Sequence, residues 1–579
     1  MTKNISSKKI SRRKFLKISA LATAGALAGF PDIKASIPTA ELVLTNGKII
    51  TMDNKDSIMQ AMAVRGGKII DIGQVDAISQ YIGTGTRIID LKGKTVTPGL
   101  IDSHAHLPMF GQRENGWFVK LQGLMSKEEI METLAQKARK LPKGEWISAW
   151  GVEDLSTSYL DKEDLDKVTK EHPMLVVHTT GQWGFANSLA LKISGIDGNT
   201  MSPPGSKVVM KLFAKGPTGA LLNYPALELV REHMPLPTDA QAKEALLFAA
   251  KLYAAEGVTS VHDNFFTLGA PYFQKAYFES VQAGTLPVRI KIWPYFANYN
   301  VATIVFKILF ASGKVPPAAP IREIVRYKNE YPELFSSMWG GFKMAVDGVP
   351  LWYGSPQGFP LHKTEDLHAM FKLFHKAGHQ VSIHACGDKA VDMILDAIEA
   401  SLKEYPRQNH RHRIEHAILP QASSLERMKR LGVVVSTHPQ FIYSWGDKWG
   451  AMKTRAEVIP VHSYLREGIP VAFGADPPAF PVYRPQVALW QALKRTTKEG
   501  SRFDSAESVS IQEALRIQTM GSAYSGFQEG EIGSIEKGKL ADMAVWDRDF
   551  YTVSPDQIKD VKTVLTIMGG KIVHETKDS

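Results

Sequence analysis

The sequence predicts an α/β protein in which a (β/α)8 barrel of the TIM type is combined with a small β-sandwich built from both ends of the chain. Between residues 97 and 524, short apolar runs alternate with longer segments of helical periodicity, which is typical of a parallel barrel. Residues 36–96 and 525–579 instead contain short β-type runs separated by glycine turns. A chain of 579 residues with 44% apolar residues is large enough to build such a core.

The first 35 residues are expected to be a targeting sequence rather than part of the fold. Arg12 and Arg13 precede an apolar run at residues 18–30, and small residues around Ala35 offer a cleavage point. This pattern resembles a twin-arginine export signal, so we expect a periplasmic or extracellular protein. A plain secretory signal or a membrane anchor is the alternative, but the apolar run is short for a membrane span.

Charge and cysteine content narrow the classes of partner. The formal net charge is +10, but residues 1–35 contain eight Lys or Arg and one Asp, which leaves about +3 for the rest of the chain. This charge is too small and too scattered to indicate nucleic-acid binding. Cys386 is the only cysteine, which excludes an internal disulfide, and no second apolar stretch is long enough to span a membrane. We therefore expect a small-molecule substrate as the partner, and homo-oligomerisation stays open.

Both ends of the chain carry the same pattern of strands and turns. The turns Asn46-Gly47, Gly66-Gly67 and Gly569-Gly570 each separate two short apolar runs, and each predicts a β-hairpin. We infer that the two ends pair in one β-sandwich that brackets the barrel.

Nine apolar runs are candidates for the eight barrel strands, and the pattern does not settle the choice among the second to fourth. The runs lie at residues 96–106, 175–178, 258–262, 289–293, 342–346, 381–384, 413–416, 433–436 and 470–473. Residues of about 110–234 and 301–320 are predicted insertions relative to a minimal barrel, and either can cover its mouth as a lid.

Polar side chains stand within or just after five of these runs, at the end of a barrel where reactive residues lie. They are His104, His106, Lys343, His384, His416 and Asp476. His104 and His106 are two residues apart, so in a strand they point the same way. Neutral imidazoles bind zinc and similar divalent ions, and a nearby carboxylate can move a proton. The pattern predicts a metal centre with Asp476 as the proton carrier.

The order of these motifs resembles the amidohydrolase superfamily. The motifs are Pro-Gly-Leu-Ile-Asp-Ser-His-Ala-His at 98–106, the strand lysine Lys343, His-Ala-Cys-Gly-Asp at 384–388, Arg-Ile-Glu-His at 413–416 and Gly-Ala-Asp-Pro-Pro at 474–478. Residues 217–219, 257–263 and 343–348 are similar to the amidohydrolase 3 branch, which includes deformylases of N-substituted formamides. The resemblance covers essentially the whole mature chain. It implies a metal-dependent hydrolase barrel with a β-sandwich from both termini, in agreement with the fold predicted above.

The resemblance also implies a role for each residue. His104 and His106 would bind a more buried metal ion. His384 and His416 would bind a more exposed ion. Asp476 would bind the first ion and shuttle the proton, and Lys343 would be carboxylated on its amine and bridge both ions.

The number and identity of the ions stay open. A bare ammonium at Lys343 would repel cations, so a carboxylated lysine or a one-metal site are the two consistent options, of which the binuclear one is favoured. An ion pair of Lys343 with Asp347 is the structural alternative. Zinc is expected, with one or two ions per chain, although iron, manganese or nickel suit four imidazoles nearly as well.

Departures from the family pattern indicate an altered substrate pocket. Gln182 stands where many relatives have histidine, Asn223 where glutamate is common, and His438 where glutamine is usual. Together with Trp183 and His262, these residues are the predicted pocket positions. Because small-molecule sites are largely apolar, we expect some further aromatic residues in the wall, among Trp117, Phe185, Trp352, Tyr353, Trp445 and Trp449.

The predicted function is metal-dependent hydrolysis of an amide-like, non-peptide carbon–nitrogen bond in a small molecule, with a metal-activated hydroxide as the nucleophile. The same site would suit a carbamate, a lactone or another ester, because only the leaving group differs. A binding protein that has kept the barrel and lost turnover is the alternative from another class.

Overall fold

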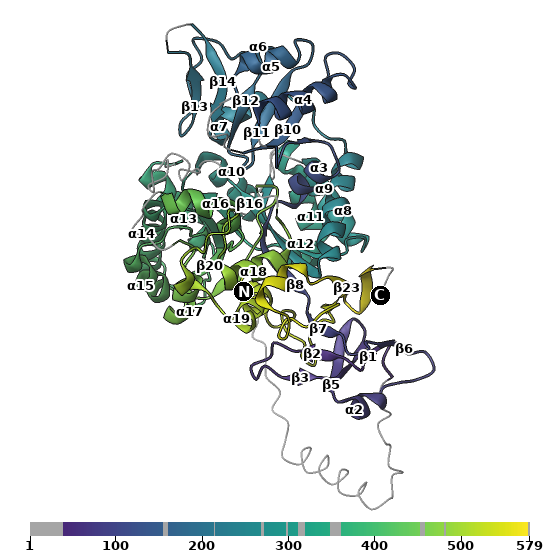
Figure 1. The fold of residues 1–579 in the computed structure, drawn as a ribbon. Coiled ribbons are helices and arrows are strands. Elements are labelled where there is room, and N and C mark those ends of the chain that lie inside the picture. Colours follow the sequence, from purple (N-terminus) through teal and green to yellow (C-terminus); the bar gives the residue numbers. More distant parts are fainter. Residues whose placement is uncertain are drawn as a thin grey trace, which may run out of the picture.

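The computed structural model describes residues 39–124, 126–153, 160–212, 215–267, 271–296, 299–310, 319–347, 361–451, 458–479 and 482–576. The predicted targeting segment at residues 1–35 and the aromatic residues Trp352 and Tyr353 lie outside this part of the chain. None of the helices in the described ranges combines the length and the apolar character needed to cross a membrane. Figure 1 shows three stacked parts, with the sandwich at the bottom, the barrel in the middle and a separate sheet at the top.

Eight parallel strands form the barrel in the order β21-β20-β19-β18-β17-β16-β15-β8. They are β8 (Leu100–Ala105), β15 (Val258–Thr267), β16 (Arg289–Tyr295), β17 (Phe342–Ala345), β18 (Val381–Ala385), β19 (Arg413–His416), β20 (Val434–Thr437) and β21 (Val471–Phe473). At the seam between β21 and β8, the N–H of Asp476 donates to the carbonyl of His104 at 2.7 Å. The predicted barrel is therefore confirmed, as a nearly closed one.

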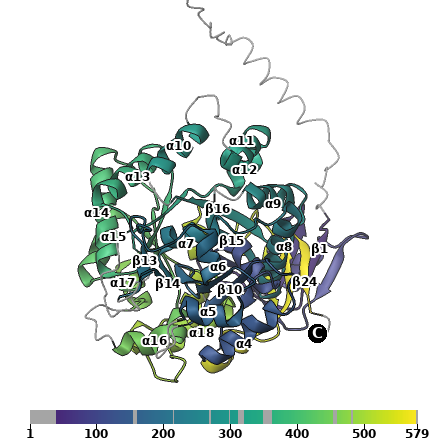
Figure 2. The same cartoon turned by 90° about the horizontal axis from the view of Figure 1, so that it is seen from above.

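Helices surround the barrel strands, as the view from above shows (Figure 2). They are α3 (Leu107–Glu114), α8 (Asp239–Ala255), α9 (Pro271–Gln282), α10 (Tyr299–Phe310), α11 (Ala319–Glu330), α12 (Pro332–Met338), α13 (Thr364–Lys376), α14 (Asp388–Glu404), α15 (Ala422–Leu431), α16 (Phe441–Ala451), α17 (Val461–Glu467), α18 (Pro485–Lys494), α19 (Ile511–Arg516) and α20 (Ser522–Ser525). In α14 the buried residues Val391, Ile394 and Ile398 recur every three or four positions, which is the spacing that presents one apolar face to the strands.

The insertion after β8 folds as a separate mixed sheet in the order β13-β14-β12-β11-β10-β9. Its strands are β9 (Val119–Lys120), β10 (Ile147–Val152), β11 (Met174–His178), β12 (Trp183–Ala186), β13 (Lys207–Met210) and β14 (Pro217–Leu222), with helices α4 (Lys127–Ala138), α5 (Lys162–Val168), α6 (Ser188–Ile193) and α7 (Tyr224–Arg231). The candidate strand at residues 175–178 belongs to this sheet, not to the barrel. It is buried on both faces, so its sequence looks like that of a barrel strand.

The two ends of the chain pair in the sandwich, as predicted. One sheet has the order β24-β23-β22-β7-β2-β3 and the other β5-β4-β1-β6. The strands are β1 (Leu42–Thr45), β2 (Lys48–Ile50), β3 (Ile58–Met59), β4 (Ala61–Arg65), β5 (Lys68–Gly73), β6 (Arg87–Asp90), β7 (Thr95–Pro98), β22 (Met543–Trp546), β23 (Thr563–Met568) and β24 (Lys571–Glu575), and helix α2 (Val75–Ser79) follows β5. Antiparallel pairing of Val96 in β7 with Val545 in β22 joins the ends.

Of the three predicted hairpins, that at Asn46-Gly47 is wrong. β1 pairs with β4 and β6, whereas β2 pairs with β3 and β7, so this turn carries the chain from one sheet to the other. At Gly47 a Cβ atom would lie 2.3 Å from Leu91, which explains the glycine without a hairpin. The turns at Gly66-Gly67 and Gly569-Gly570 do join paired antiparallel strands.

Candidate metal centre and active site

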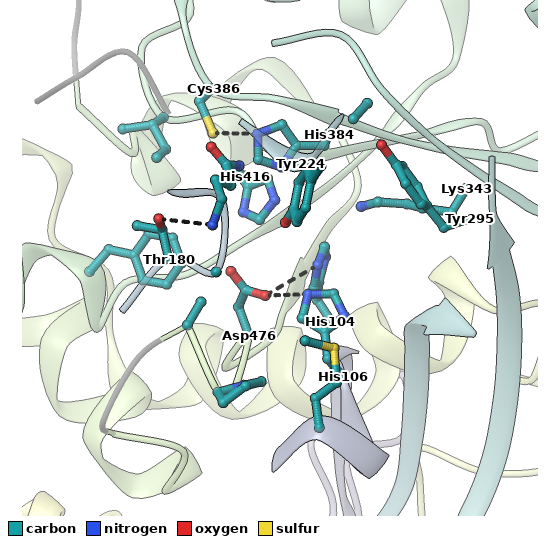
Figure 3. A pocket seen from close by; sticks show the side chains of 18 of the residues that line it. His104, His106, Thr180, Tyr224, Tyr295, Lys343, His384, Cys386, His416 and Asp476 are labelled. Atoms are coloured by element: carbon teal, nitrogen blue, oxygen red, sulfur yellow. Dashed lines mark hydrogen bonds and ion pairs between the residues drawn. The ribbon is translucent and has the colours of Figure 1, made fainter. Parts of the chain in front are cut away.

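The carboxyl ends of the barrel strands bring the predicted metal-binding side chains into one cluster, shown from close by in Figure 3. His104 comes from β8, Lys343 from β17, His384 from β18 and His416 from β19, while His106 follows β8 and Asp476 follows β21. Because parallel barrel strands all end at this face, positions far apart in the sequence converge there.

At one end of the cluster, the carboxylate of Asp476 lies close to two histidines. Its Oδ1 lies 2.9 Å from Nε2 of His106 and 3.5 Å from Nε2 of His104. The three side chains offer ligand atoms that lie within 4.8 Å of one another. This spacing suits three donors around one cation.

The orientation of His104 is set by the carboxylate of Glu415. Oε2 of Glu415 lies 2.6 Å from Nδ1 of His104, and the same carboxylate accepts hydrogen bonds from Arg413 at 2.7 Å and Ser382 at 2.8 Å. Burial alone would raise the pKa of Glu415, but the positive charges of Arg413 and Lys343 and these hydrogen bonds hold it below its usual value. An ionised Glu415 keeps the hydrogen of His104 on Nδ1, so Nε2 presents its lone pair to the cluster.

His438 lies in the histidine cluster itself, whereas the sequence predicts it in the pocket wall. It forms a group with His104 and His416 whose ligand atoms are within 4.8 Å of one another. Its Nδ1 lies 2.8 Å from the carbonyl of Gly474 and therefore carries the hydrogen. Its Nε2 is buried and makes no hydrogen bond among the described residues. His438 can thus serve as a further metal ligand.

The other end of the cluster is formed by His384, His416 and Cys386, whose ligand atoms are likewise within 4.8 Å of one another. The two imidazole rings have centroids 4.3 Å apart. Sγ of Cys386 lies 3.4 Å from Nε2 of His384. Burial raises the pKa of this thiol well above its usual value.

Lys343 points toward the cluster from β17 (Figure 3). Its side chain is 3% exposed, and Nζ makes no hydrogen bond among the described residues. Burial lowers the pKa of the amine to about 8, although Glu415 and Asp476 act in the opposite direction. Asp347 does not take it as an ion-pair partner in the described part of the chain, because the Asp347 carboxylate accepts the N–H groups of Cys386 and Gly387 at 3.1 and 2.9 Å.

The donor set fits a divalent cation. Burial lowers the pKa of His104, His384 and His416 well below the usual value, so these imidazoles are neutral and offer lone pairs. Neutral imidazoles with one carboxylate are ligands that zinc and similar metals prefer. A cation would also be bound by the buried lone pair of His438 Nε2. The described residues therefore form a candidate metal centre with places for one or two ions.

The five predicted pocket residues lie in different parts of the structure. Gln182 lines the cavity at the cluster. Trp183 stacks on His178 in the core of the insertion sheet, and Asn223 donates to the carbonyl of Gly205 before α7. His262 lies between Arg413 and Gln528 inside the barrel, so its ring supports the site rather than facing the pocket.

Phe441 and three further aromatic residues line the cavity but were not among the predicted pocket positions. Tyr224 begins α7, Tyr295 ends β16 and Trp150 lies in β10, and all three line the cavity with the metal cluster. Burial raises the pKa of both tyrosines, so their hydroxyls keep their hydrogens. The position of Tyr295 at the end of a barrel strand is the one signal in the sequence that indicates it.

A second cavity adjoins this one, and Trp150 lines both. The cavity at the cluster has a volume of about 60 Å³, and its neighbour, which shares His106, Met109 and Trp150, has about 490 Å³. The larger chamber lies between the insertion sheet, α3 and α9, and its wall includes Trp117, Phe118, Tyr272 and Phe273. The indole of Trp150 donates to the carbonyl of Thr179 at 3.2 Å, which fixes the position of the ring in the shared wall.

Comparison with known proteins places the chain in a family. The sequence profile of the Amidohydrolase family matches residues 87–574. The chain is 26% identical to the N-substituted formamide deformylase of Arthrobacter pascens, over 93% of this chain and 99% of that protein. It is 30% identical to the protein LONG AFTER FAR-RED 3 of Arabidopsis thaliana, over 92% of each. In fold it is similar to an uncharacterized metal-dependent hydrolase of Pyrococcus horikoshii, with a TM-score of 0.66, 24% identity and coverage of 89% and 99%.

These matches extend over the barrel and most of the sandwich, and they agree with the ordered histidine, lysine and aspartate motifs. The matches therefore favour an enzyme over a binding protein that has lost turnover. The chain belongs to the amidohydrolase family and is a hydrolase that acts on carbon–nitrogen bonds other than peptide bonds.

Proposed function

We propose that this protein hydrolyses the amide bond of small molecules in which an apolar, preferably aromatic, amine carries a very short acyl group such as formyl. The observation that carries the proposal is the two-part cavity. The cavity at the metal cluster has a volume of about 60 Å³, whereas the adjoining chamber has about 490 Å³. The acyl group would occupy the inner space and the amine substituent the outer chamber.

The walls of the two spaces support this division. Tyr224, Tyr295 and Trp150 place three large rings in the wall of the inner cavity, which favours a short acyl group there. The outer chamber offers several aromatic faces, which favour an apolar or aromatic substituent. The name of the Arthrobacter pascens relative, an N-substituted formamide deformylase, agrees with this choice of substrate.

The metal ligands in this proposal are His104, His106, His384, His416 and Asp476, with zinc as the favoured ion and one or two ions per chain. A bound divalent cation would supply Lewis acidity, which polarises a carbonyl and makes water more acidic. Lys343 carries a carboxyl group in the binuclear form, because a buried ammonium beside two cations would be strongly repelled.

Asp476 is the proton carrier. Its carboxylate lines the inner cavity beside His106, which is where this mechanism requires a base for the attacking water. Asp476 takes a proton from this water and gives it to the leaving nitrogen, so that the C–N bond breaks to release a carboxylic acid and an amine. The hydroxyls of Tyr224 and Tyr295 provide hydrogen-bond donors for the substrate on the opposite wall (Figure 3).

A series of amides of one arylalkyl amine tests the proposal. Zinc-reconstituted protein should release the amine from the formamide at least tenfold faster, in kcat/KM, than from the butanamide, because each added methylene has to be accommodated in the crowded inner cavity. Amine release is measured by chromatography, with the Asp476→Asn variant as the inactive control. A preference for the longer acyl group, or no release by metal-loaded protein, would refute the proposal.

We also propose that the chain is exported through its twin-arginine-type segment and acts in the periplasm or outside the cell. Replacement of Arg12 and Arg13 by Lys should retain the protein in the cytoplasm, and fractionation with immunodetection measures this. Unchanged export would contradict it.

A further inference from the structure

We propose that Cys386 is a metal ligand, which would give the His384 end of the cluster a thiolate donor and a preference for thiophilic cations such as zinc, cobalt or cadmium. The inference rests on the proposed function only in requiring that the cluster binds metal. No other cysteine exists in the chain, so every thiol signal reports on this position.

The distances agree with coordination. Sγ of Cys386 lies 3.4 Å from Nε2 of His384, and both are within 4.8 Å of a ligand nitrogen of His416. A tetrahedral zinc ion with Zn–N near 2.0–2.1 Å and Zn–S near 2.3 Å holds its nitrogen and sulfur ligands about 3.6 Å apart. The distance between Sγ of Cys386 and Nε2 of His384 is close to this value, and the His416 nitrogen is near enough to join them.

The backbone holds the sulfur at the cluster. The N–H groups of Cys386 and Gly387 donate to the buried carboxylate of Asp347, which fixes the turn after β18. The Cys386 side chain is 3% exposed and lines the cavity together with Lys343 and His416 (Figure 3). A metal ion at this turn would bind a sulfur that is already in place.

A second observation points to a ligand at the same place. His416 is 3% exposed, and its Nδ1 is buried without a hydrogen-bond partner among the described residues. The Nζ atom of Lys343, in the same cavity, is also buried without one. Such unsatisfied polar atoms are costly in a folded protein unless a ligand completes them.

A thiolate at Cys386 would balance charge at the His384 end of the cluster. At one end of the cluster His104 and His106 are joined by the carboxylate of Asp476, and at the other end His384 and His416 are joined by Cys386. Each end then has two imidazoles and one donor that can carry a negative charge. If a metal ion bound here, a metal–sulfur bond would replace the S–H bond, the proton would pass to solvent, and the thiolate would offset part of the buried cationic charge.

Cobalt reconstitution of the full chain tests the inference. Metal-free protein is loaded anaerobically with Co²⁺, its cobalt content is determined by elemental analysis, and its near-ultraviolet absorption is recorded. Wild type should show a sulfur-to-cobalt charge-transfer band that Cys386→Ser lacks. Met109→Leu removes another sulfur that lines the cavity and should retain the band.

A thiol measurement on wild type alone complements the spectra, in case Cys386→Ser folds poorly. The rate of reaction with a small disulfide reagent should fall at least tenfold when zinc is added to the metal-free chain. Cobalt bound by wild type without a charge-transfer band would overturn the inference and leave the proposed function intact. No bound metal at all would overturn both.

Discussion

The carboxylate of Glu415 lies 2.6 Å from Nδ1 of His104, while the other nitrogen of the same ring faces Asp476. Glu415 is one residue before His416 and fully buried, so a single short strand, β19, supplies a cluster member and the group that orients another. Glu415 should therefore affect the metal affinity of the cluster without being a metal ligand itself.

The Glu415→Gln variant should bind zinc about 10- to 100-fold more weakly, because an uncharged amide does not hold the hydrogen of His104 on Nδ1. Competition with a chromophoric chelator measures the affinity. Glu507→Gln is a matched control, since Glu507 is also buried but binds Ser463 instead. Equal zinc affinities of the Glu415→Gln variant and wild type would contradict the orienting role.

Trp150→Ala should relax the limit on the acyl group, because it removes the largest side chain that lines both cavities. We expect the formamide-to-butanamide ratio of kcat/KM to fall about tenfold, equivalent to about 1.4 kcal/mol. Trp117→Ala changes only the far chamber and should leave this ratio unaltered while raising KM for aromatic amines. If both variants kept the wild-type ratio, Trp150 would not limit the acyl group.

Lys343→Ala should reduce the metal content of protein purified without a chelating column. If the lysine bridges two ions, elemental analysis will give two per chain for wild type and one or none for the variant. One ion in both proteins would make Lys343 structural and the site mononuclear. A chelator should abolish hydrolysis, and added zinc should restore it.

A second histidine group, remote from the metal cluster, links stability to pH. The N–H of Val381 donates to Nδ1 of His412, whose Nε2 lies 2.9 Å from Nδ1 of His375, and Nε2 of His375 lies 2.7 Å from the carbonyl of Tyr405. Only neutral rings satisfy this relay, with each Nε2 donating.

His410 is neutral for the same reason. Its Nδ1 accepts the N–H of His412 at 3.0 Å, and its Nε2 donates to the carbonyl of Leu431 at 2.7 Å. Burial lowers the pKa of His410 to about 4 and also lowers those of His375 and His412.

The sign of the pH effect follows from these lowered values. Above about pH 6.5 the rings are neutral in both the folded and the unfolded chain, and stability is complete. Below this pH the unfolded chain takes up protons first, so the free energy of unfolding falls toward pH 4. The titration of His410 alone should lower it by about 2 kcal/mol at pH 5. His410→Asn keeps the acceptor and removes the titration. Its loss of unfolding free energy between pH 7.5 and 5 should be smaller than that of wild type, and equal losses would argue against this account.

The sequence predicts the barrel and its metal cluster well because both depend on local patterns. A histidine such as His384 ends an apolar run, and strands of a parallel barrel all end at one face. The pairing of the two chain ends was also predictable, since both carry strand-rich segments that need a partner sheet.

Contacts made by the insertion sheet were not predictable in this way. Trp150 and Tyr224 reach the cavity only because that sheet docks over the barrel mouth, and no local pattern records such docking. For the same reason the apolar strand at Met174–His178 could not be assigned to a sheet by periodicity. The Asn46-Gly47 turn was misjudged because a turn signal does not say which strands pair.

The join between Val96 and Val545 also has a consequence for how the chain is made. A ribosome adds roughly 5–20 residues per second, so about 20 to 90 s pass between the synthesis of these two positions. During this time the edge of β7 that later receives β22 has no partner, and β21, which carries the chain to Asp476, has not yet been made when β8 emerges. The nascent protein therefore cannot complete its ion-binding cluster until most of the polypeptide has left the ribosome, and newly made chains will depend on being kept from aggregating until then.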